Sequence, residues 1–475
     1  MHFDLNRTPS ARLFADARQI IHLALPMMVA QTAQVATGFV DAAMSGHVST
    51  EDLAAVSIGS SIFLTTYVTL MGLVTALNPI LSHLLGAGEH ERIGAVGRQG
   101  LWFGLIIGLI GTALLFAVQP LLRSVLHLPA AVEDKTMLFI TGTALAMPAA
   151  MVHRALHAFA ASLNRPRPIM VMSIAALLLN IPLNYILIHG LFGMPRLGGA
   201  GCGWATAAAF WFNAAALFCY IAANRHFRPY GLTRRVDRPD WRALREFLHL
   251  GLPIGLSFFV EISLFAFIAL LIAPLGALTV ASHQAAMNFS SIIYMVPQSI
   301  SSALTVLVGQ RLGADDARGA RRITGVGIAL GLMGGVLIML AIFLWRSDII
   351  RLYTDDPRLI ELGASLLLFA AVYQLTDSTQ TIASGALRGY KLTRVPMLIH
   401  VTAFWGVGLA LGVLLGRTDW LVAPPMGVYG FWTALVISLS AAALLLISYL
   451  ARQSRLRLTA PSSALESPRE LDVHR

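Results

Sequence analysis

The stretch His22-Leu-Ala-Leu-Pro26 returns 227 residues later as His249-Leu-Gly-Leu-Pro253. The same offset relates other short runs, so an internal duplication covers most of the 475-residue chain. Two like halves that pack side by side leave a cleft between them, so the repeat predicts a two-lobed protein. The further matches are Leu85-Gly86-Ala87 with Leu312-Gly313-Ala314, and Gly203, Thr206 and Ala207 with Gly430, Thr433 and Ala434.

The composition indicates a chain that lies in lipid. Hydrophobic residues make up 56% of it, charged residues make up 12%, and the mean hydropathy is +0.71. A water-soluble globular protein does not have such a composition. Twelve apolar stretches approach the roughly 20 residues that a helix needs to cross the hydrocarbon. The expected spans cover residues 20–46, 53–84, 101–122, 137–159, 169–188, 204–223, 247–273, 280–308, 323–344, 360–387, 397–415 and 431–450.

These stretches predict an all-α integral membrane protein with twelve transmembrane helices in two six-helix lobes. Because six is even, both halves enter the membrane from the same side, as in a parallel repeat with a pseudo-two-fold axis along the membrane normal. Pro26 and Pro253 occupy matching places, where each either fixes a kink or lets its helix bend. The expected segments are an N-terminal cytoplasmic segment (1–19), an N-terminal lobe (20–223), a basic cytoplasmic linker (224–246), a C-terminal lobe (247–450) and a disordered cytoplasmic tail (451–475).

The positive charge favours one orientation in the membrane. The chain has a net charge of +10 and contains 34 Lys and Arg. With an even number of spans, 26 of these cations fall on the side of the termini and 7 fall on the opposite side. Cationic loops stay in the cytoplasm, so both termini are expected there, and nucleic-acid binding is not expected. The expected linker carries Arg225, Arg228, Arg234, Arg235, Arg238, Arg242 and Arg245.

Three carboxylates lie inside the expected spans, namely Asp41, Glu261 and Asp377. A charged side chain at mid-bilayer costs roughly 2.5 to 3.5 kcal/mol, so such groups mark pathways for ions or substrates. Asp41 lies nearer a helix end, which leaves an interfacial position open for it. At the 227-residue offset, Gln34 corresponds to Glu261 and Ile268 corresponds to Asp41. The two halves are therefore alike in frame and different in charge.

Three pairs of polar residues lie four positions apart and share a helix face. Tyr373 and Asp377 place an aromatic ring and a carboxylate where both can face one cation. The amide pairs either line a path for substrate or hold helices together by hydrogen bonds of about 0.6 kcal/mol each. These amide pairs are Asn180 with Asn184, and Gln284 with Asn288.

One stretch, His153-Arg-Ala-Leu-His157, is similar to an enzyme motif. Arg154 stands where a zinc protease needs its general-base glutamate, so a hydrolase is not expected. A packed polar patch is the preferred interpretation, and a metal held by the two histidines stays open. The sequence has no P-loop, so ATP is not the expected energy source, and no cofactor is expected.

Three runs together resemble the multidrug and toxic compound extrusion (MATE) family. The resemblance covers residues 20–450 and is strongest for the bacterial NorM-like branch, because Glu261, Tyr373 and Asp377 fall where that branch carries a cation site. The runs are Val40-Asp41-Ala-Ala-Met44-Ser45-Gly46-His47, then Ala281-Ser-His-Gln284 with Pro297 and Val308-Gly-Gln-Arg-Leu-Gly-Ala314, and finally Gly385-Ala-Leu-Arg388-Gly-Tyr-Lys391.

The resemblance implies a multidrug efflux antiporter of the bacterial inner membrane. Such a protein exports amphipathic organic cations, including drugs and dyes, by alternating access, and it confers antibiotic resistance. Inward flow of Na+, or alternatively H+, drives the export. The protein is expected to act as a monomer in the lipid bilayer without an obligatory protein partner.

The resemblance also assigns roles to residues. Glu261 and Asp377, assisted by Tyr373, are expected to hold the coupling ion, with Na+ as the expected metal. Asn184 stands where some relatives carry a second acid, so the N-terminal lobe alone is not expected to bind that ion. The expected substrate contacts are Asp41, Asn180, Gln284, Asn288 and, near the outer mouth, Asp356.

Three other functions stay open. A lipid-linked precursor flippase of the same superfamily handles anionic head groups and needs several cations in its cavity. In this chain Arg154 is the only Lys or Arg placed well inside an expected span. A membrane-embedded enzyme needs a nucleophile, a metal triad or suitably spaced acids, and the sequence shows none of these. A passive channel needs no competition between ion and substrate, and counterflow of labelled substrate separates it from an exchanger.

Overall fold

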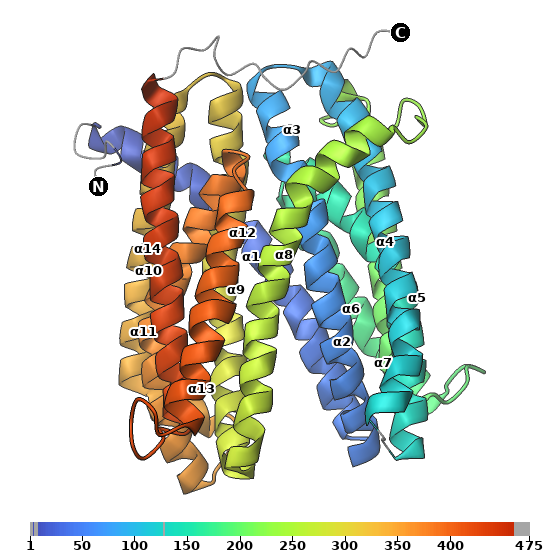
Figure 1. The fold of residues 1–475 in the computed structure, drawn as a ribbon. Coiled ribbons are helices and arrows are strands. Elements are labelled where there is room, and N and C mark those ends of the chain that lie inside the picture. The colour runs from blue at the N-terminus through green and yellow to red at the C-terminus, as the bar shows by residue number, and fades with distance from the viewer. Residues whose placement is uncertain (1–2, 4–7, 127–128, 460–475) are drawn as a thin grey trace.

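The structure, a computed structural model, describes residues 3, 8–126 and 129–459 (Figure 1). This described part contains no β-strand and has twelve helical spans long and apolar enough to cross a membrane, which confirms the predicted all-α membrane fold. The helices of the first half are α1 (Ser10–Gly46), α2 (Thr50–Val74), α3 (Leu77–Gly86), α4 (His90–Leu126), α5 (Ala130–Ser162), α6 (Arg167–His189) and α7 (Gly201–Ala223). The helices of the second half are α8 (Trp241–Ile272), α9 (Ala277–Gly313), α10 (Ala317–Arg351), α11 (Pro357–Gly389), α12 (Arg394–His400), the π-helix η5 (Val401–Leu409), α13 (Ala410–Arg417) and α14 (Val428–Thr459).

Several helices continue past the apolar stretches that predict them. α1 begins inside the segment 1–19, α8 begins inside the expected linker, and α14 ends inside the expected tail. The predicted disorder is therefore wrong for residues 451–459, and residues 460–475 lie outside the described part. A helix forms its backbone hydrogen bonds internally, so it can leave the hydrocarbon and continue through polar sequence.

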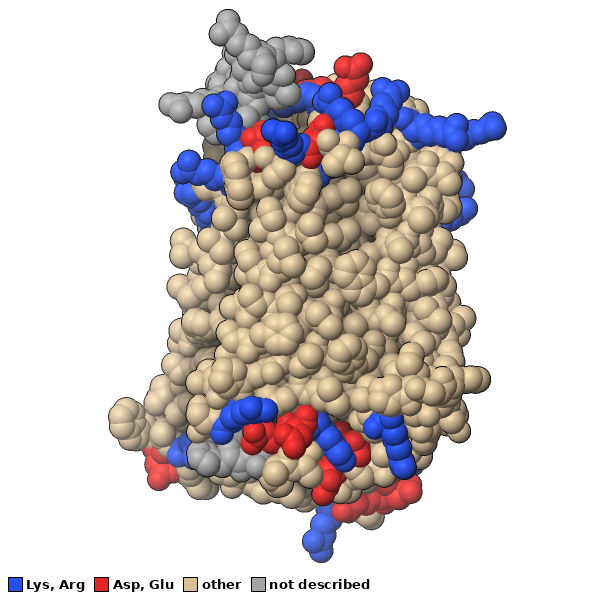
Figure 2. Space-filling model, turned by 90° about the vertical axis from the view of Figure 1, so that its right-hand side faces the viewer, with Lys and Arg blue, Asp and Glu red and all other residues tan. Residues whose placement is uncertain are grey.

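One face of the molecule has a broad band without charged side chains between two charged ends (Figure 2). On α4, for example, the side chains of Leu109, Leu114 and Leu121 are exposed. Large apolar side chains are stable on a surface that faces lipid, so the band corresponds to the membrane. The start of α1 and the end of α14 lie at the same end of the bundle, which we call the terminal face (Figure 1).

The first helix of each half crosses from one lobe to the other. Asp16, near the start of α1, pairs with Arg322 of α10 at 2.6 Å. Asp41, near the end of α1, accepts a hydrogen bond from Asn184 of α6 at 2.7 Å. α1 therefore starts against the second half of the chain and ends within its own half.

α8 also starts at the terminal face, but it starts against the first half of the chain and ends within the second half (Figure 1). Near its start, the ring of Phe247 packs against Phe103 of α4, with ring centroids 5.6 Å apart. Near its end, Ser263 accepts a hydrogen bond from the Trp405 indole of η5 at 3.0 Å. The proline that each half carries in its first helix lies inside a continuous helix in both cases.

The two lobes are joined by polar contacts at the terminal face. Asp16 is 2% exposed and lies 3.6 Å from Arg311 of α9 in addition to its pairing with Arg322. The side-chain amide of Gln310 donates to the Ser162 carbonyl at 2.9 Å and also contacts Asn164. Within the described residues, every ion pair and side-chain hydrogen bond that joins the lobes lies at this face.

Two glycines bring α3 and α9 into backbone contact at the same face. A methyl group on Gly86 would overlap the Gln310 carbonyl, and one on Gly313 would overlap the His83 carbonyl. Gly86 and Gly313 are repeat partners at the 227-residue offset. The duplicated Leu-Gly-Ala run thus supplies both sides of one nearly symmetrical contact, which only glycine permits.

Candidate functional site

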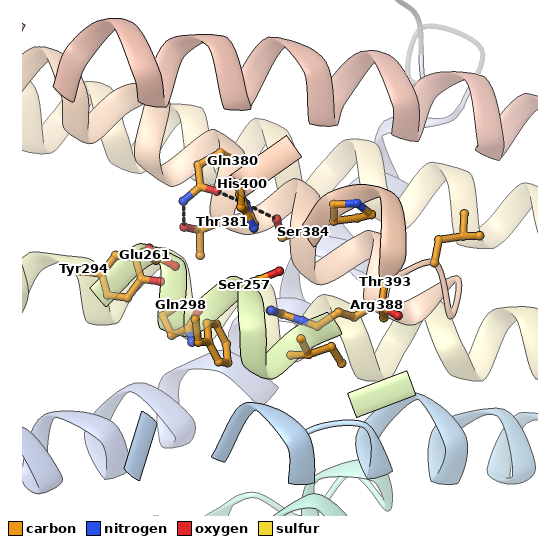
Figure 3. Close-up of a pocket in the computed structure, with 14 residues that line it drawn as sticks. Ser257, Glu261, Tyr294, Gln298, Gln380, Thr381, Ser384, Arg388, Thr393 and His400 are labelled. Carbon is orange, nitrogen blue, oxygen red and sulfur yellow. Dashed lines mark hydrogen bonds between the residues drawn. The ribbon is translucent and has the colours of Figure 1, made fainter. Parts of the chain in front are cut away.

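A small cavity lies inside the C-terminal lobe, between α8, α9, α11 and α12 (Figure 3). Its walls follow helical spacing, with positions 254, 257, 258 and 261 on α8 and positions 380, 384 and 388 on α11. Residues three and four apart lie on one side of a helix, so each helix contributes one face. The polar lining residues are Ser257, Glu261, Tyr294, Gln298, Gln380, Thr381, Ser384, Arg388, Thr393 and His400.

The size of the cavity limits its guest. Its volume of about 20 Å³ is close to the space that one water molecule needs. Pockets for drug-sized ligands measure roughly 300 to 1,000 Å³. The cavity therefore fits a water molecule or a bare monovalent ion and excludes an organic cation.

One acid of the C-terminal lobe lines an end of this cavity, and the other lies close behind it. Glu261 is half-buried and lies beside Tyr294 (Figure 3). Asp377 is 5% exposed, lies behind the wall on α11, and interacts electrostatically with Glu261. The structure thus brings together the two acids that the sequence analysis pairs.

A hydrogen-bond chain holds Asp377 in place. The side-chain amide nitrogen of Gln380 donates to the Asp377 carboxylate at 3.0 Å and to the Thr381 hydroxyl at 3.1 Å. The Gln380 carbonyl oxygen lies 2.9 Å from Nε2 of His400. Because that oxygen can only accept, Nε2 carries the proton of the neutral imidazole. Asp377 is thereby fixed, whereas Glu261 faces the cavity directly.

Tyr373 lies apart from the cavity. It is buried one helical turn before Asp377, and its ring tilts against Trp432 of α14 with centroids 5.9 Å apart. The tyrosine that does line the cavity is Tyr294, which is not among the predicted site residues. Tyr373 therefore backs Asp377, and Tyr294 faces the space beside Glu261.

Arg388 lies at the other end of the cavity. It is 8% exposed, its Nη2 donates to the Ser301 hydroxyl at 2.7 Å, and its guanidinium carbon lies 5.6 Å from the ring centroid of Phe258. The expectation that Arg154 is the only cation well inside a span is wrong for this reason. α11 continues to Gly389, past the predicted end of its span, and carries Arg388 into the lobe.

A second polar cluster surrounds Asp41 in the N-terminal lobe. Asp41 is 4% exposed, and its two carboxylate oxygens accept hydrogen bonds from Asn184 at 2.7 Å and from Thr206 at 2.8 Å. The Asn184 amide also donates to Asn180 at 3.0 Å. Asp41 is therefore buried rather than interfacial. Asp41 and Asn180 are both among the predicted substrate contacts, whereas Thr206 is known from the sequence only as a residue of the repeat.

The other predicted substrate contacts lie outside both clusters. Gln284 and Asn288 are exposed on α9 and share a hydrogen bond of 3.2 Å. Asp356 is exposed at the end opposite the terminal face. It caps α11 by accepting a hydrogen bond from the Arg358 backbone at 2.9 Å.

The histidine pair of α5 is buried. The rings of His153 and His157 meet edge to face with centroids 6.4 Å apart, and none of their nitrogens has a hydrogen-bond partner. The described residues contain no group of three or more His, Cys, Asp or Glu placed to hold a metal. Two imidazoles alone fall short of the four ligands of a structural zinc site, so the geometry favours the packed patch.

The residues that the sequence analysis misses carry a periodic signal. Asp377, Thr381, Ser384 and Arg388 are spaced by four, three and four residues, so they form one stripe along α11. The spacing alone thus places Asp377 and Arg388 on the same face of the helix. It is easily missed because the apolar stretch of this span ends one residue before Arg388.

Paired lobes of six spans, with acids buried in the middle of the bundle, define a multi-pass membrane transporter. A family model described as MatE matches residues 26–186 and 253–414. The two matched segments start 227 residues apart, so they are the two repeats. The chain belongs to the MATE family, in its NorM-like branch, and this is a family of transporters rather than of enzymes.

Individual relatives agree with this assignment over nearly their full length. The chain is 62% identical to a probable multidrug resistance protein NorM of Chromobacterium violaceum, covering 96% of this chain and 98% of the relative. It is 51% identical to the protein of the same name from Neisseria meningitidis serogroup A, covering 94% and 96%. Among solved structures, the MATE transporter NorM-NG in complex with a dye and a monobody is 45% identical, covers 94% and 96%, and superposes with a TM-score of 0.78.

Proposed function

We propose that this protein is a multidrug efflux antiporter that exports amphipathic organic cations in exchange for Na+ or, alternatively, H+ entering the cell. The observation that carries the proposal is the cavity of the C-terminal lobe, where Glu261 faces a space for one small cation and Asp377 lies close behind the wall. The names of the multidrug relatives and the complex of NorM-NG with a dye support drugs and dyes as the exported class.

In this proposal Glu261 and Asp377 hold the coupling ion. Hard cations prefer oxygen ligands, and the carboxylates, the Tyr294 hydroxyl and the Thr381 hydroxyl supply oxygen at or beside the cavity. Tyr373 assists by packing behind Asp377. A proton can neutralise the same carboxylates, so the donor set accommodates both candidate ions.

The organic cation binds elsewhere, because the cavity is too small for it. The proposed contacts are Asp41 with Asn180 in the N-terminal lobe, and Gln284, Asn288 and Asp356 on exposed positions of the second half. Apolar neighbours add contacts with little directionality, which suits flat lipophilic cations of different shapes.

The wall of the cavity also belongs to the interface between the lobes. Phe258 lines the cavity and packs against Gly72 of α2 and against Ala76, which lies between α2 and α3. In this proposal, neutralising the acids changes the position of α8, which carries both Glu261 and Phe258 and contacts both lobes. Ion and drug then favour different arrangements of the lobes, and each one promotes release of the other. The contacts at the terminal face correspond to the outward-open arrangement.

The orientation and the setting follow from the charge distribution. The terminal face carries the excess of Lys and Arg, so we place it and both termini in the cytoplasm. The bacterial relatives support the inner membrane as the location. Each lobe closes its own cluster without a second copy, which favours a monomer.

The proposal is tested by ethidium export from proteoliposomes in which a Na+ gradient and a pH gradient are imposed separately. One gradient should drive uphill export, and both Glu261→Gln and Asp377→Asn should abolish it because they remove the charge that the ion neutralises. Glu361→Gln, at an exposed position of α11, is the control and should keep the wild-type rate. Uphill export at the wild-type rate in both acid variants would remove the proposed site.

The flippase alternative is weaker on the geometry. Arg388, like Arg154, is a buried cation inside its lobe, as an anionic head group would need. The cavity that Arg388 lines has room for about one water molecule, however, and cannot admit a head group. Counterflow of labelled dye separates the remaining alternative, a passive channel, from an exchanger.

A further inference from the structure

The buried guanidinium of Arg388 has no role in the ion and drug binding proposed above. It comes from the last turn of α11, and it lines the same cavity as Glu261. Side chains on a helix lean toward its N-terminus, so Arg388 leans back along α11 toward Asp377. Figure 3 shows the guanidinium on the side of Ser257, directed into the cavity rather than toward the nearby terminal face.

Few groups satisfy this cation. Nη2 donates to Ser301, the guanidinium lies over the ring of Phe258, and Nε has no hydrogen-bond partner. Within the described residues Arg388 makes no ion pair at 4.0 Å or less. A buried charge needs compensation nearby, since taking it out of water costs several kcal/mol. The carboxylates at the other end of the cavity are the negative charges available.

The groups that face Arg388 from every neighbouring helix can be counted. Glu261 on α8 and Tyr294 on α9 line the same cavity as Arg388, and His400 on α12 is hydrogen-bonded to Gln380 at 2.9 Å. Arg154 of α5, in the other lobe, is the other cation whose charge acts on Arg388. The charged members of the site within the C-terminal lobe are thus two acids and one arginine.

We propose that Arg388 is a fixed internal counter-charge that limits the C-terminal-lobe site to one monovalent cation per transport cycle. This inference rests on the proposed function. Two carboxylates and one guanidinium leave a net charge of −1, which a single Na+ or proton neutralises. Without Arg388 the site carries −2, and the space that the arginine side chain vacates in the cavity wall allows it to take up two cations. Arg388 is in this sense a positioning residue, because it sets the charge that the coupling ion meets.

Charge movement during exchange tests the proposal for either ion. Proteoliposomes that exchange monovalent ethidium for one cation move no net charge, so an imposed membrane potential should not change wild-type transport. Arg388→Gln should make exchange respond to the potential by about tenfold per 60 mV of added negative potential inside, because two cations then enter for each ethidium. Arg388→Lys retains the charge and should behave as wild type. Arg358→Gln, at an exposed position of the same helix, is the matched control.

A double variant distinguishes a role in charge balance from a purely structural role of Arg388, because a structural role predicts no recovery of exchange. Glu261→Gln alone leaves the site neutral and should stop exchange. Adding Arg388→Gln restores the net charge to −1, so E261Q/R388Q should regain exchange that is insensitive to potential. Thermal unfolding of each purified variant shows whether it is folded.

The outcomes separate the two proposals. If wild type shows no ion-driven exchange, or if Glu261→Gln transports normally, the proposed function fails. If both behave as expected but Arg388→Gln stays electroneutral and the double variant stays inactive, only the role of Arg388 is overturned. A wild-type exchange that responds to the potential overturns that role without any variant, so the test does not depend on the folding of Arg388→Gln.

Discussion

The two lobes use the same helical frame for different polar sites. In the N-terminal lobe, both oxygens of Asp41 are occupied by hydrogen bonds from Asn184 and Thr206. In the C-terminal lobe, Glu261 faces a cavity with room for one small ion. A carboxylate whose partners are fixed can attract a passing cation by charge, whereas a carboxylate beside free space can also take the ion in.

The repeat offset shows how far the two sites have diverged. The cavity residues Gln380, Thr381 and Ser384 correspond to His153, Arg154 and His157 at the same offset. Neutral groups beside the acids in one lobe are thus basic or aromatic groups in the other. Duplication preserved the backbone positions, whereas substitution placed basic side chains in the N-terminal lobe where the C-terminal lobe has neutral ones.

The largest expected effect comes from moving the acid between the lobes. Glu261→Gln combined with Gln34→Glu places a carboxylate at the repeat-equivalent position of the first half. We expect loss of all gradient-driven ethidium export, because position 34 lacks Asp377, Gln380 and the cavity. Proteoliposome export measures this, with Gln34→Glu alone as the control. Export restored by the double variant would show that the acid matters and its surroundings do not.

A smaller effect is expected from Asp41→Asn. The amide removes an attractive charge and sets an N–H against donors from Asn184 or Thr206, so the KM for ethidium should rise about tenfold, or about 1.4 kcal/mol. The dependence on the ion gradient should stay unchanged. Initial rates at several ethidium concentrations measure the effect, and Asp134→Asn, exposed in the same lobe, is the control. An unchanged KM with lost coupling would reverse the roles of the lobes.

If the two lobes carry different sites, exchange requires them to move relative to each other about their contacts at the terminal face. Asp16→Asn removes the ion pairs to Arg311 and Arg322, so it should shift the equilibrium between the two arrangements about fivefold, or about 1 kcal/mol, away from the outward-open one. Distances between spin labels on the α3–α4 and α9–α10 loops report the populations. Asp315→Asn, exposed in the α9–α10 loop, should leave them unchanged.

The smallest effect is expected at Thr206, and its repeat partner Thr433 serves as the control. Thr206→Val removes one hydrogen bond to Asp41 and should raise the KM for ethidium about threefold, because the carboxylate becomes less well oriented. Thr433→Val removes only a bond to the Tyr429 carbonyl of its own helix and should have no effect. Equal effects of the two substitutions would indicate that Thr206 acts through its helix and not through Asp41.

Much of the fold could be predicted, because its signals are local. The twelve spans follow from runs of apolar residues, and the two lobes follow from an offset that the family model reproduces in its two matched segments. The limits of α8 and α14 could not be predicted in the same way. Hydropathy reports where a chain meets lipid, whereas a helix ends where its backbone hydrogen bonds end.

The site was predictable in part. Asp41, Glu261 and Asp377 are identifiable because a carboxylate in an apolar run is costly wherever its helix packs. Tyr294 and Arg388 were not identified, since a tyrosine is common in membrane helices and Arg388 stands at the edge of its apolar run. Their importance arises from neighbours on other helices, which a single stretch of sequence does not show.

Patterns along the chain alone specify that it crosses the membrane twelve times as a duplicated pair of lobes, and which acids lie in apolar stretches. Those properties depend on residues close together along the chain. Helix packing establishes that α1 and α8 each cross from one lobe to the other, that Glu261 faces a space of about one water molecule, and that Arg388 lines the same space. These features arise where four or more helices pack together, and a cavity of that size depends on side-chain positions that no local pattern specifies.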